Sequence, residues 1–335
     1  MPSSSKANVG ISRRDLLTAL PAAALLASCN WTPPYRRSDF PLDPRSTVGL
    51  FPASSYDVDF ADLITRGLAD LRIDVRGRSV LLKPNLVEYA PGTVINTHPL
   101  VVAGAATAFL TAGAREVVVG EAPGHRRDIE YLLAVTGLAD YLKDLRIRFV
   151  DLNHGDVEMV ALKSHFTGLD QMALPREILR SDFVVSMAKL KTHHWAAMTA
   201  SMKNLFGVVP GAIYGWPKNI LHYRGIENSI LDLNATIRPQ FTIVDAVIAM
   251  EGDGPIMGAP RAMGFLAMGS DLVAVDATCA RVIGFDPAKI GYLSQASAFL
   301  GHIDEARIDQ RGENPSRYRT RFDVLEPFRK LQTPG

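Results

Sequence analysis

The segment KLKTHHWAAMTASMKNLFGVVPG, residues 189–211, mixes cationic, imidazole and apolar side chains in one short stretch. Lys189, Lys191 and Lys203 carry positive charge, and His193 precedes Lys203 by ten residues. A lysine among apolar neighbours loses its proton easily and can act as a nucleophile or covalent tether, whereas histidine is the usual base near neutral pH. We therefore predict a site for an anionic small molecule, with His193 and Lys203 as its catalytic groups.

Polar residues that could bind this anion lie in the same segment and after an earlier apolar run. They are Lys83, Asn85, Lys189, Lys191 and Asn204. Ammonium groups pair with phosphate or carboxylate, and amide groups add directional hydrogen bonds. For any single lysine, a solvated surface position is the alternative.

An acidic set farther along the chain could hold a divalent metal. Asp245, Glu251 and Asp253 provide the carboxylate oxygens that a hard cation such as Mg²⁺ prefers. They could equally orient lysines through ion pairs, which is the simpler interpretation. No HExxH or comparable metal spacing occurs. The two cysteines, Cys29 and Cys279, are too few for a four-thiolate iron–sulfur cluster in this chain.

Six short apolar runs indicate the elements that must position these groups. They cover residues 79–82, 116–119, 147–150, 183–187, 241–249 and 265–268, with helix-like segments between them. This alternation predicts an α/β fold with a mostly parallel sheet and helices on both faces, as one domain or two lobes. We expect the helix between the first two runs to be capped by Asn96 or Thr97. Since ligands bind at the carboxyl ends of strands in open α/β sheets, the polar residues there should line one crevice.

The first 28 residues have the pattern of an export signal. Arg13 and Arg14 precede an apolar run, residues 16–26, that is too short to span a bilayer. This pattern resembles a twin-arginine signal, and LASC, which ends at Cys29, resembles a lipoprotein box. Removal of residues 1–28 changes the formal charge from +1 to −1, so a lipid on Cys29 would be the membrane anchor. An ordinary cleaved signal with a chance cysteine is the alternative.

Length and composition bound the remainder of the chain. Its 335 residues, 47% of them hydrophobic, suit an α/β domain over residues 46–300. A proline-rich tether at 29–45 would precede this domain, and a polar extension at 301–335 would follow it. A formal charge of +1 gives no basic excess for nucleic acid. Because the first 28 residues resemble an export signal, we expect a periplasmic or cell-envelope protein.

Five motifs resemble the family called domain of unknown function 362, over roughly residues 78–300. They are LLKPNL, THP, KLKTHHWAAMTASMKNLFGVVPG, VDAVIAMEGDGPIMG and SDLVAVDATCARVIGFDP. Members of this family are often joined to ferredoxin-type iron–sulfur modules, which implies redox or cofactor chemistry. Because this chain lacks the cysteines for such a module, the resemblance implies a separate redox partner.

The order of polar residues from 153 to 222 is also similar to that of the nickel-pincer lactate racemase. This resemblance implies His154 and His193 as acid/base groups. It also implies Lys203 as the tether of a nickel-pincer nucleotide and His222 as the metal ligand. The chain departs from the pattern in the sequence TASM before the lysine and in the displaced position of His222.

These observations predict an enzyme that performs acid/base or redox chemistry on an anionic small molecule or with a phosphorylated or metal cofactor. The alternative is a non-catalytic envelope lipoprotein that binds an anionic metabolite or assists a redox complex. Lys203 discriminates between the two, because an enzyme would bury it near His193 and a binding module would leave it solvated.

Overall fold

The computed structural model describes residues 33–124 and 128–334, of which those from 35 onward belong to one compact unit. The predicted export signal and Cys29 lie outside the described residues. Within the described part, no helix combines the length and the apolar content that a bilayer crossing requires.

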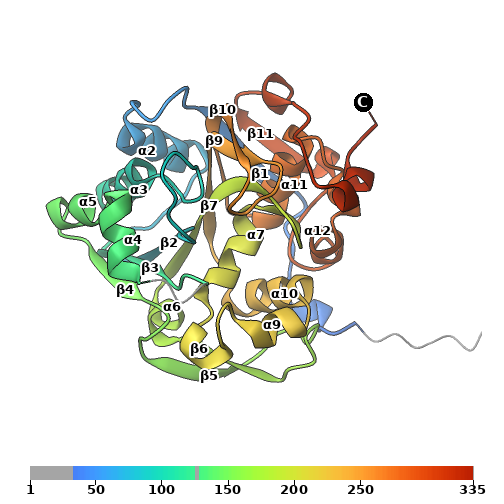
Figure 1. The fold of residues 1–335 in the computed structure, drawn as a ribbon, viewed down its shortest axis with the longest axis horizontal. Helices are drawn as coiled ribbons and strands as arrows, with labels where there is room; N and C mark the ends of the chain where they lie inside the picture. The colour runs from blue at the N-terminus through green and yellow to red at the C-terminus, as the bar shows by residue number, and fades with distance from the viewer. Residues whose placement is uncertain (1–32, 125–127, 335) are drawn as a thin grey trace, which may run out of the picture. The chain divides into compact units, whose positions relative to one another are not determined.

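A nine-stranded sheet forms the centre of this unit (Figure 1). Its strands are β1 Ser46–Pro52, β2 Ser79–Pro84, β3 Glu116–Glu121, β4 Arg148–Asp151, β7 Phe183–His193, β8 Ala197–Thr199, β9 Phe241–Glu251, β10 Ala259–Gly269 and β11 Ile308–Gly312. They lie in the order β11, β1, β10, β9, β7, β2, β3, β4, and β8 pairs with β7. Strands β9, β7, β2, β3 and β4 run parallel, whereas β10 is antiparallel to both of its neighbours. A separate hairpin joins β5 Val157–Ala161 to β6 Gln171–Pro175.

Helices cover both faces of the sheet. They are α2 Phe60–Asp70, α3 Pro99–Thr111, α4 Ile129–Thr136, α5 Leu138–Asp144, α6 Arg176–Arg180, α7 Ser201–Asn204, α8 Gly211–Tyr214, α9 Asn219–Tyr223, α10 Ile226–Ile237, α11 Leu272–Val282 and α12 Gly291–Ala296. One core packs α2, α3 and α5 on the sheet, and the other packs α7, α10, α11 and α12 (Figure 1). Side chains alternate between these cores along β2, because Val80 and Leu82 join the first and Leu81 the second. The predicted α/β fold with a mostly parallel sheet is confirmed.

All six apolar runs form strands of the sheet, namely β2, β3, β4, β7, β9 and β10. Strands β1 and β11 and the β5–β6 hairpin were not predicted. Gly49 interrupts the apolar pattern of β1, and β11 buries only Ile308 fully, so neither segment has a continuous apolar run. Strand β11 lies within the segment expected to be a polar extension, and it is an edge strand paired with β1.

Helix α3 begins in the predicted region, but a different residue caps it. His98 is the N-cap, and its Nδ1 accepts a hydrogen bond from the Leu100 N–H at 3.3 Å. Asn96 and Thr97 instead hold the preceding loop, and the Thr97 hydroxyl donates to the Met187 carbonyl. The expectation that Asn96 or Thr97 would cap this helix was therefore wrong.

Candidate functional site

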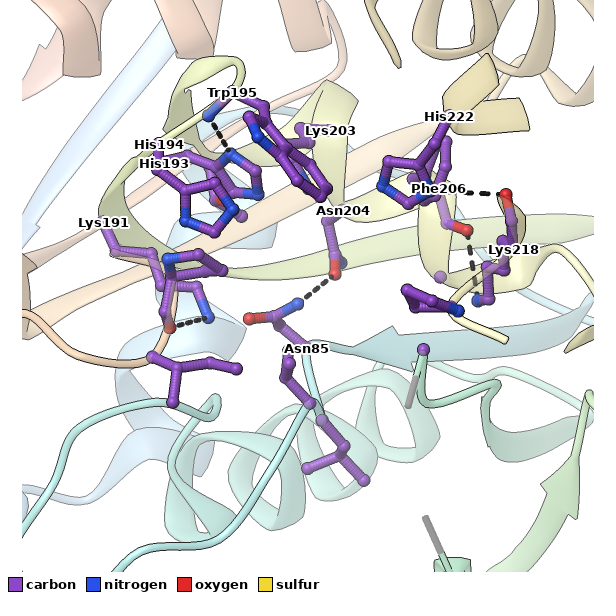
Figure 2. Close-up of a pocket in the computed structure, with 18 of the residues that line it drawn as sticks. Asn85, Lys191, His193, His194, Trp195, Lys203, Asn204, Phe206, Lys218 and His222 are labelled. Atoms are coloured by element: carbon purple, nitrogen blue, oxygen red, sulfur yellow. Dashed lines mark hydrogen bonds between the residues drawn. The ribbon is translucent and has the colours of Figure 1, made fainter. Parts of the chain in front are cut away.

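One cavity at the carboxyl ends of β2, β3, β7 and β9 gathers most of the predicted site residues (Figure 2). It holds about 380 Å³, a volume within the range of small-molecule sites. Its lining residues include Asn85, Glu121, Lys191, His193, Trp195, Thr199, Lys203, Asn204, Phe206, Lys218, His222 and Asp253. Segments far apart in the sequence therefore meet at this edge of the sheet, as the strand order requires.

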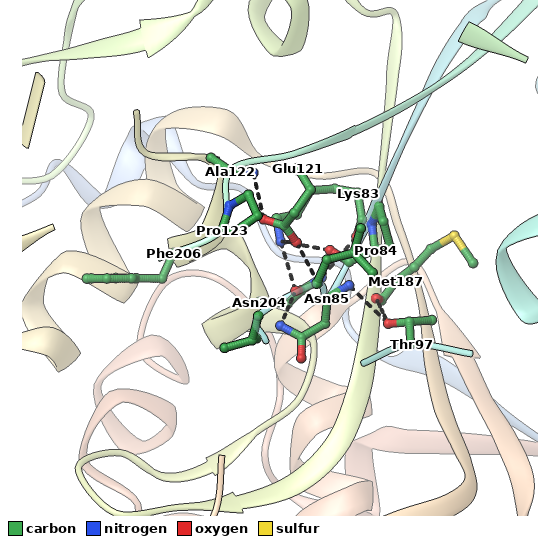
Figure 3. Close-up of polar contacts among 12 residues, drawn as sticks. Lys83, Pro84, Asn85, Thr97, Glu121, Ala122, Pro123, Met187, Asn204 and Phe206 are labelled. Atoms are coloured by element: carbon green, nitrogen blue, oxygen red, sulfur yellow. Dashed lines mark hydrogen bonds and ion pairs between the residues drawn. The ribbon is translucent and has the colours of Figure 1, made fainter. Parts of the chain in front are cut away.

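A buried ion pair forms part of the polar network next to this cavity (Figure 3). The Lys83 Nζ donates to Glu121 Oε2 at 2.6 Å, to Asn204 Oδ1 at 3.0 Å and to a backbone carbonyl. The Glu121 carboxylate also accepts from the backbone N–H groups of Leu86 and Ala122. Burial lowers the pKa of Lys83, and the Glu121 charge opposes this shift. Since all three ammonium donors are used, Lys83 holds the network together and has no donor left for a ligand.

The same network fixes the orientation of two amides. Because Asn204 Oδ1 accepts from Lys83, the Asn85 Nδ2 must be the group that donates to Asn204 Oδ1, at 3.2 Å. Asn85 Oδ1 is thereby left buried and without a hydrogen-bond partner among the described residues, and so is the Thr199 hydroxyl. Buried polar atoms without partners are uncommon in folded proteins. The cavity therefore offers an acceptor and a hydroxyl to a ligand.

Lys203 lines the cavity from helix α7 and is half-buried. In the part of the chain that the structure describes, its Nζ has no hydrogen-bond or ion-pair partner, and the Phe206 ring centroid lies 5.6 Å away. Burial, with a smaller contribution from the Lys83 ammonium, lowers the pKa of Lys203 to about 8. A useful fraction of Lys203 is therefore a neutral amine near neutral pH.

Lys191 and Lys218 place two more buried amino groups at the cavity. The Lys191 Nζ donates to the carbonyls of Ile95 and Pro255, and the Lys218 Nζ donates to that of Ala122 at 2.6 Å. Burial lowers the pKa of Lys218 to about 7 and that of Lys191 well below its usual value. Neither lysine has a carboxylate partner among the described residues, so a bound anion would favour their charged forms.

His193 lines the cavity as a hydrogen-bond donor. Its Nδ1 accepts from the backbone N–H groups of Trp195 at 3.0 Å and Ala196 at 3.2 Å, so the ring proton lies on Nε2. Burial and the nearby Lys203 charge hold the pKa of His193 well below its usual value, which keeps the ring neutral. This geometry makes the His193 Nε2–H a hydrogen-bond donor, and the acid/base role predicted from the sequence stays a prediction.

The set implied by the racemase resemblance is only partly assembled. His222 lines the cavity with its ring between those of Trp195 and Phe206, at centroid distances of 5.0 and 4.9 Å. His154 is not among the cavity residues, because its Nδ1 lies 2.7 Å from Asp151 Oδ2 and its side chain is 65% exposed. The cavity therefore holds His193 and not His154, so the two histidines that the resemblance implies as acid/base groups do not both line it.

The acidic residues predicted to hold a cation are dispersed. Asp245 is fully buried and pairs with Lys189 Nζ at 2.9 Å, Glu251 pairs with Arg261, and Asp253 lies at the cavity. Within the described residues, no three His, Cys, Asp or Glu side chains gather closely enough to hold a metal ion. Lys189, predicted to bind the ligand, is the counter-ion of Asp245 and does not line the cavity.

Sequence reasoning left Lys218 and Thr199 out of the site. Lys218 follows no strand, and it enters the cavity from a loop in which its own φ is +70°. Thr199 belongs to the short strand β8, which turns back on β7. Two sequence features could have indicated these residues. Lys218 lies four residues before His222, and Thr199 lies inside the lysine–histidine segment.

Comparison with known proteins identifies a family and a relative in sequence. The family model described as "Domain of unknown function (DUF362)" matches residues 80–281. The thylakoid-associated protein sll1697 of Synechocystis sp. (strain ATCC 27184 / PCC 6803 / Kazusa) is 31% identical over 223 residues, which are 64% of this chain and 65% of that protein. The chain thus spans less than two thirds of that relative's length.

Two solved structures share a distant likeness with the chain. The lactate racemase apoprotein of Thermoanaerobacterium thermosaccharolyticum has 13% identity and a TM-score of 0.42, over 72% of this chain and 57% of that one. A structural-genomics protein of Thermotoga maritima has 15% identity and a TM-score of 0.35, over 65% and 58% of the two chains.

Proposed function

The chain belongs to the domain of unknown function 362 family, and we propose that it is an enzyme acting on a small anionic molecule in the cavity described above. One observation carries this proposal. Lys203 is half-buried at the cavity, beside a neutral imidazole, and has no counter-ion among the described residues. A lysine kept in this state is suited to taking part in a reaction as base or nucleophile.

The balance of charge at the cavity supports an anionic ligand. Glu121 is already paired with Lys83, and Asp253 is a half-exposed carboxylate near the edge. No carboxylate of the described residues therefore pairs with Lys191, Lys203 or Lys218. A ligand carboxylate or phosphate would supply the missing negative charge in surroundings that screen it weakly.

The same residues supply the elements of acid–base catalysis. An amine with a pKa of about 8 can take up or release a proton at physiological pH. The His193 Nε2–H can donate to an oxygen on which negative charge develops during the reaction. In a non-catalytic anion-binding protein, the alternative, we would expect Lys203 to be solvated, whereas here it is half-buried at the cavity.

Titration with two dianions, sulfate and oxalate, tests the anion site. Both keep their charge between pH 6.5 and 9, so any pH dependence of binding comes from the protein. We expect calorimetry to show affinity falling roughly tenfold over this range, because Lys203 and Lys218 lose their protons with pKa values of about 8 and 7.

Two lysine variants sharpen this test. Lys203→Met should weaken sulfate binding about tenfold at pH 6.5 and reduce the pH dependence. The matched control, Lys289→Met, removes an exposed lysine away from the cavity and should bind like wild type. If neither dianion binds, or if both variants behave alike, the proposed function is wrong.

We also propose that the protein is exported by the twin-arginine route and held at the cell envelope by a lipid on Cys29. The sequence motifs and the proline-rich tether support this, and the relative from Synechocystis is named as thylakoid-associated. Envelope attachment would leave the folded unit free to meet a soluble anion.

Cys29→Ser should release the exported protein into the soluble periplasmic fraction, because its lipid attachment point is gone. Cys279→Ala is the matched control, since it removes the other cysteine, which is buried in α11, and should remain with the membranes. Cell fractionation with immunoblotting measures both. Membrane retention of Cys29→Ser would contradict the lipid anchor.

A further inference from the structure

We propose that Lys203 forms an imine with a carbonyl-bearing anion, such as a small 2-oxo acid, and that the His193 Nε2–H polarises the carbonyl oxygen. This inference rests on the proposed anion-binding function and names the substrate class of the same cavity. Its basis is the pairing of an unpartnered amine with a neutral hydrogen-bond donor at one cavity.

Lys203 differs from the other lysines of the site in its contacts. Lys83 uses all three of its donors within the protein, and Lys191 and Lys218 each donate to two backbone carbonyls. Lys203 Nζ makes no such bond among the described residues and lies 5.6 Å from the centroid of the Phe206 ring. Of these four amino groups, that of Lys203 is the one that makes no hydrogen bond to a described residue, so its nitrogen is available to react.

Hydrogen bonds of the residues before and after Lys203 hold the backbone that carries it. The N–H groups of Ser201 and Met202 donate to the fully buried carboxyl group of Asp276 at 2.7 and 3.0 Å. Asn204, the next residue along the chain, is fixed by Lys83. Lys203 is thus presented from a short helix whose two flanks are anchored, which favours attack from a defined position.

The donor role of His193 suits the addition of an amine to a carbonyl. Negative charge develops on the carbonyl oxygen as the carbon–nitrogen bond forms, and an N–H group aimed at this oxygen stabilises it. A protonated imidazole would be a stronger acid, but the pKa of His193 is held well below its usual value by burial and by Lys203. The polarising group is therefore the neutral ring, whose tautomer is fixed by Trp195 and Ala196.

The unpartnered Asn85 Oδ1 matches what the addition creates. A carbonyl group has no hydrogen-bond donor, whereas the carbinolamine formed from it has both an O–H and an N–H. Asn85 Oδ1 can only accept, because its Nδ2 is committed to Asn204. If Asn85 Oδ1 accepts a hydrogen bond from the carbinolamine and none from the carbonyl substrate, it stabilises the intermediate more than the substrate.

The step balances without any further reactant. The neutral Lys203 amine adds to the carbonyl carbon, and a proton moves from the nitrogen to the former carbonyl oxygen. The remaining proton of the nitrogen then moves to this hydroxyl group, which leaves as water, and a carbon–nitrogen double bond replaces the carbon–oxygen double bond. No electrons are gained or lost, and a pKa of about 8 supplies the neutral amine that the first step requires.

Trapping with borohydride tests the inference on the full chain. The protein is incubated with glyoxylate and reduced, and intact mass and peptide mapping then locate the adduct. We expect one adduct, on Lys203, with a yield that rises from pH 6.5 to 8.5 and falls when sulfate competes. Acetaldehyde, a carbonyl compound without charge, should show no preference for Lys203.

Variants separate this inference from the proposed function. Lys203→Arg keeps a positive charge but cannot form an imine, so it should bind sulfate and lose the adduct. His193→Ala should lower the initial trapping rate at least tenfold while changing sulfate affinity little. If sulfate binds but glyoxylate gives no adduct, or labels exposed lysines such as Lys289 equally, the imine is excluded while the anion site stands.

Discussion

Asp245→Ala should remove about 3–5 kcal/mol from the free energy of unfolding. The Asp245 carboxylate is fully buried and accepts from Lys189 Nζ at 2.9 Å, the Tyr56 hydroxyl at 3.1 Å and the His98 N–H at 3.0 Å. Its loss would leave the buried Lys189 ammonium without a counter-charge, which costs far more than the loss of a surface contact. Urea unfolding followed by circular dichroism measures the change.

A surface ion pair provides the control for this prediction. Asp309 pairs with Arg45 at 2.6 Å, but both side chains are about half exposed, so Asp309→Ala should leave stability nearly unchanged. Replacing both partners of the buried pair, as Asp245→Leu with Lys189→Met, should recover part of the lost stability because no lone charge remains. A loss for Asp245→Ala no larger than that for Asp309→Ala would show that the buried pair contributes little.

The sequence predicted the sheet better than it predicted which polar residues share the cavity. All six apolar runs form strands, and in β2, β3, β7 and β9 the reason is nearly continuous burial on both faces of a parallel sheet, which leaves a strong pattern. Strand β1 was missed because Gly49 interrupts its run, and its pairing with β10 is a long-range contact. Local pattern therefore identifies strands with a continuous apolar run, at the edge of the sheet as in β4, and fails at strands without one.

Lys189 and Lys191 show why the site was harder to predict. Two residues apart on a regular strand, they should point to the same face. The pairing of β7 with β9 shifts register between them, and Lys189 meets Asp245 while Lys191 reaches the cavity. The fixed tautomer of His193 likewise depends on a turn that brings two N–H groups to its Nδ1. Neither the register shift nor the tautomer of His193 can be predicted from the residue types alone.

Glu121→Gln should destabilise the protein by an amount of the same order, about 3–5 kcal/mol at pH 7. This change keeps the size of the side chain but removes the charge that Lys83 Nζ meets at 2.6 Å. Lys83 and Glu121 are both almost fully buried, so water cannot replace the lost carboxylate. Because Asn204 is fixed by Lys83, the Asn85 amide should lose its defined orientation as well.

The stability of Glu121→Gln should also depend on pH, in a direction that follows from the pKa of Lys83. Burial already lowers the pKa of Lys83, and removal of Glu121 takes away the charge that opposes this shift. The unfolded chain then binds a proton that the folded state does not, so the stability of Glu121→Gln should rise with pH up to the ordinary pKa of lysine. The slope should be about 1.4 kcal/mol per pH unit, measured by urea unfolding between pH 7 and 9.

Glu116→Gln is the matched control for this variant, because Glu116 lies on the same strand, β3, and is exposed. It should change neither the stability nor its pH dependence. Lys83 and Lys203 differ in this respect, because a buried carboxylate neutralises Lys83 and none of the described residues neutralises Lys203. If Glu121→Gln were as stable as Glu116→Gln, the buried Lys83 ammonium would not depend on the charge of Glu121.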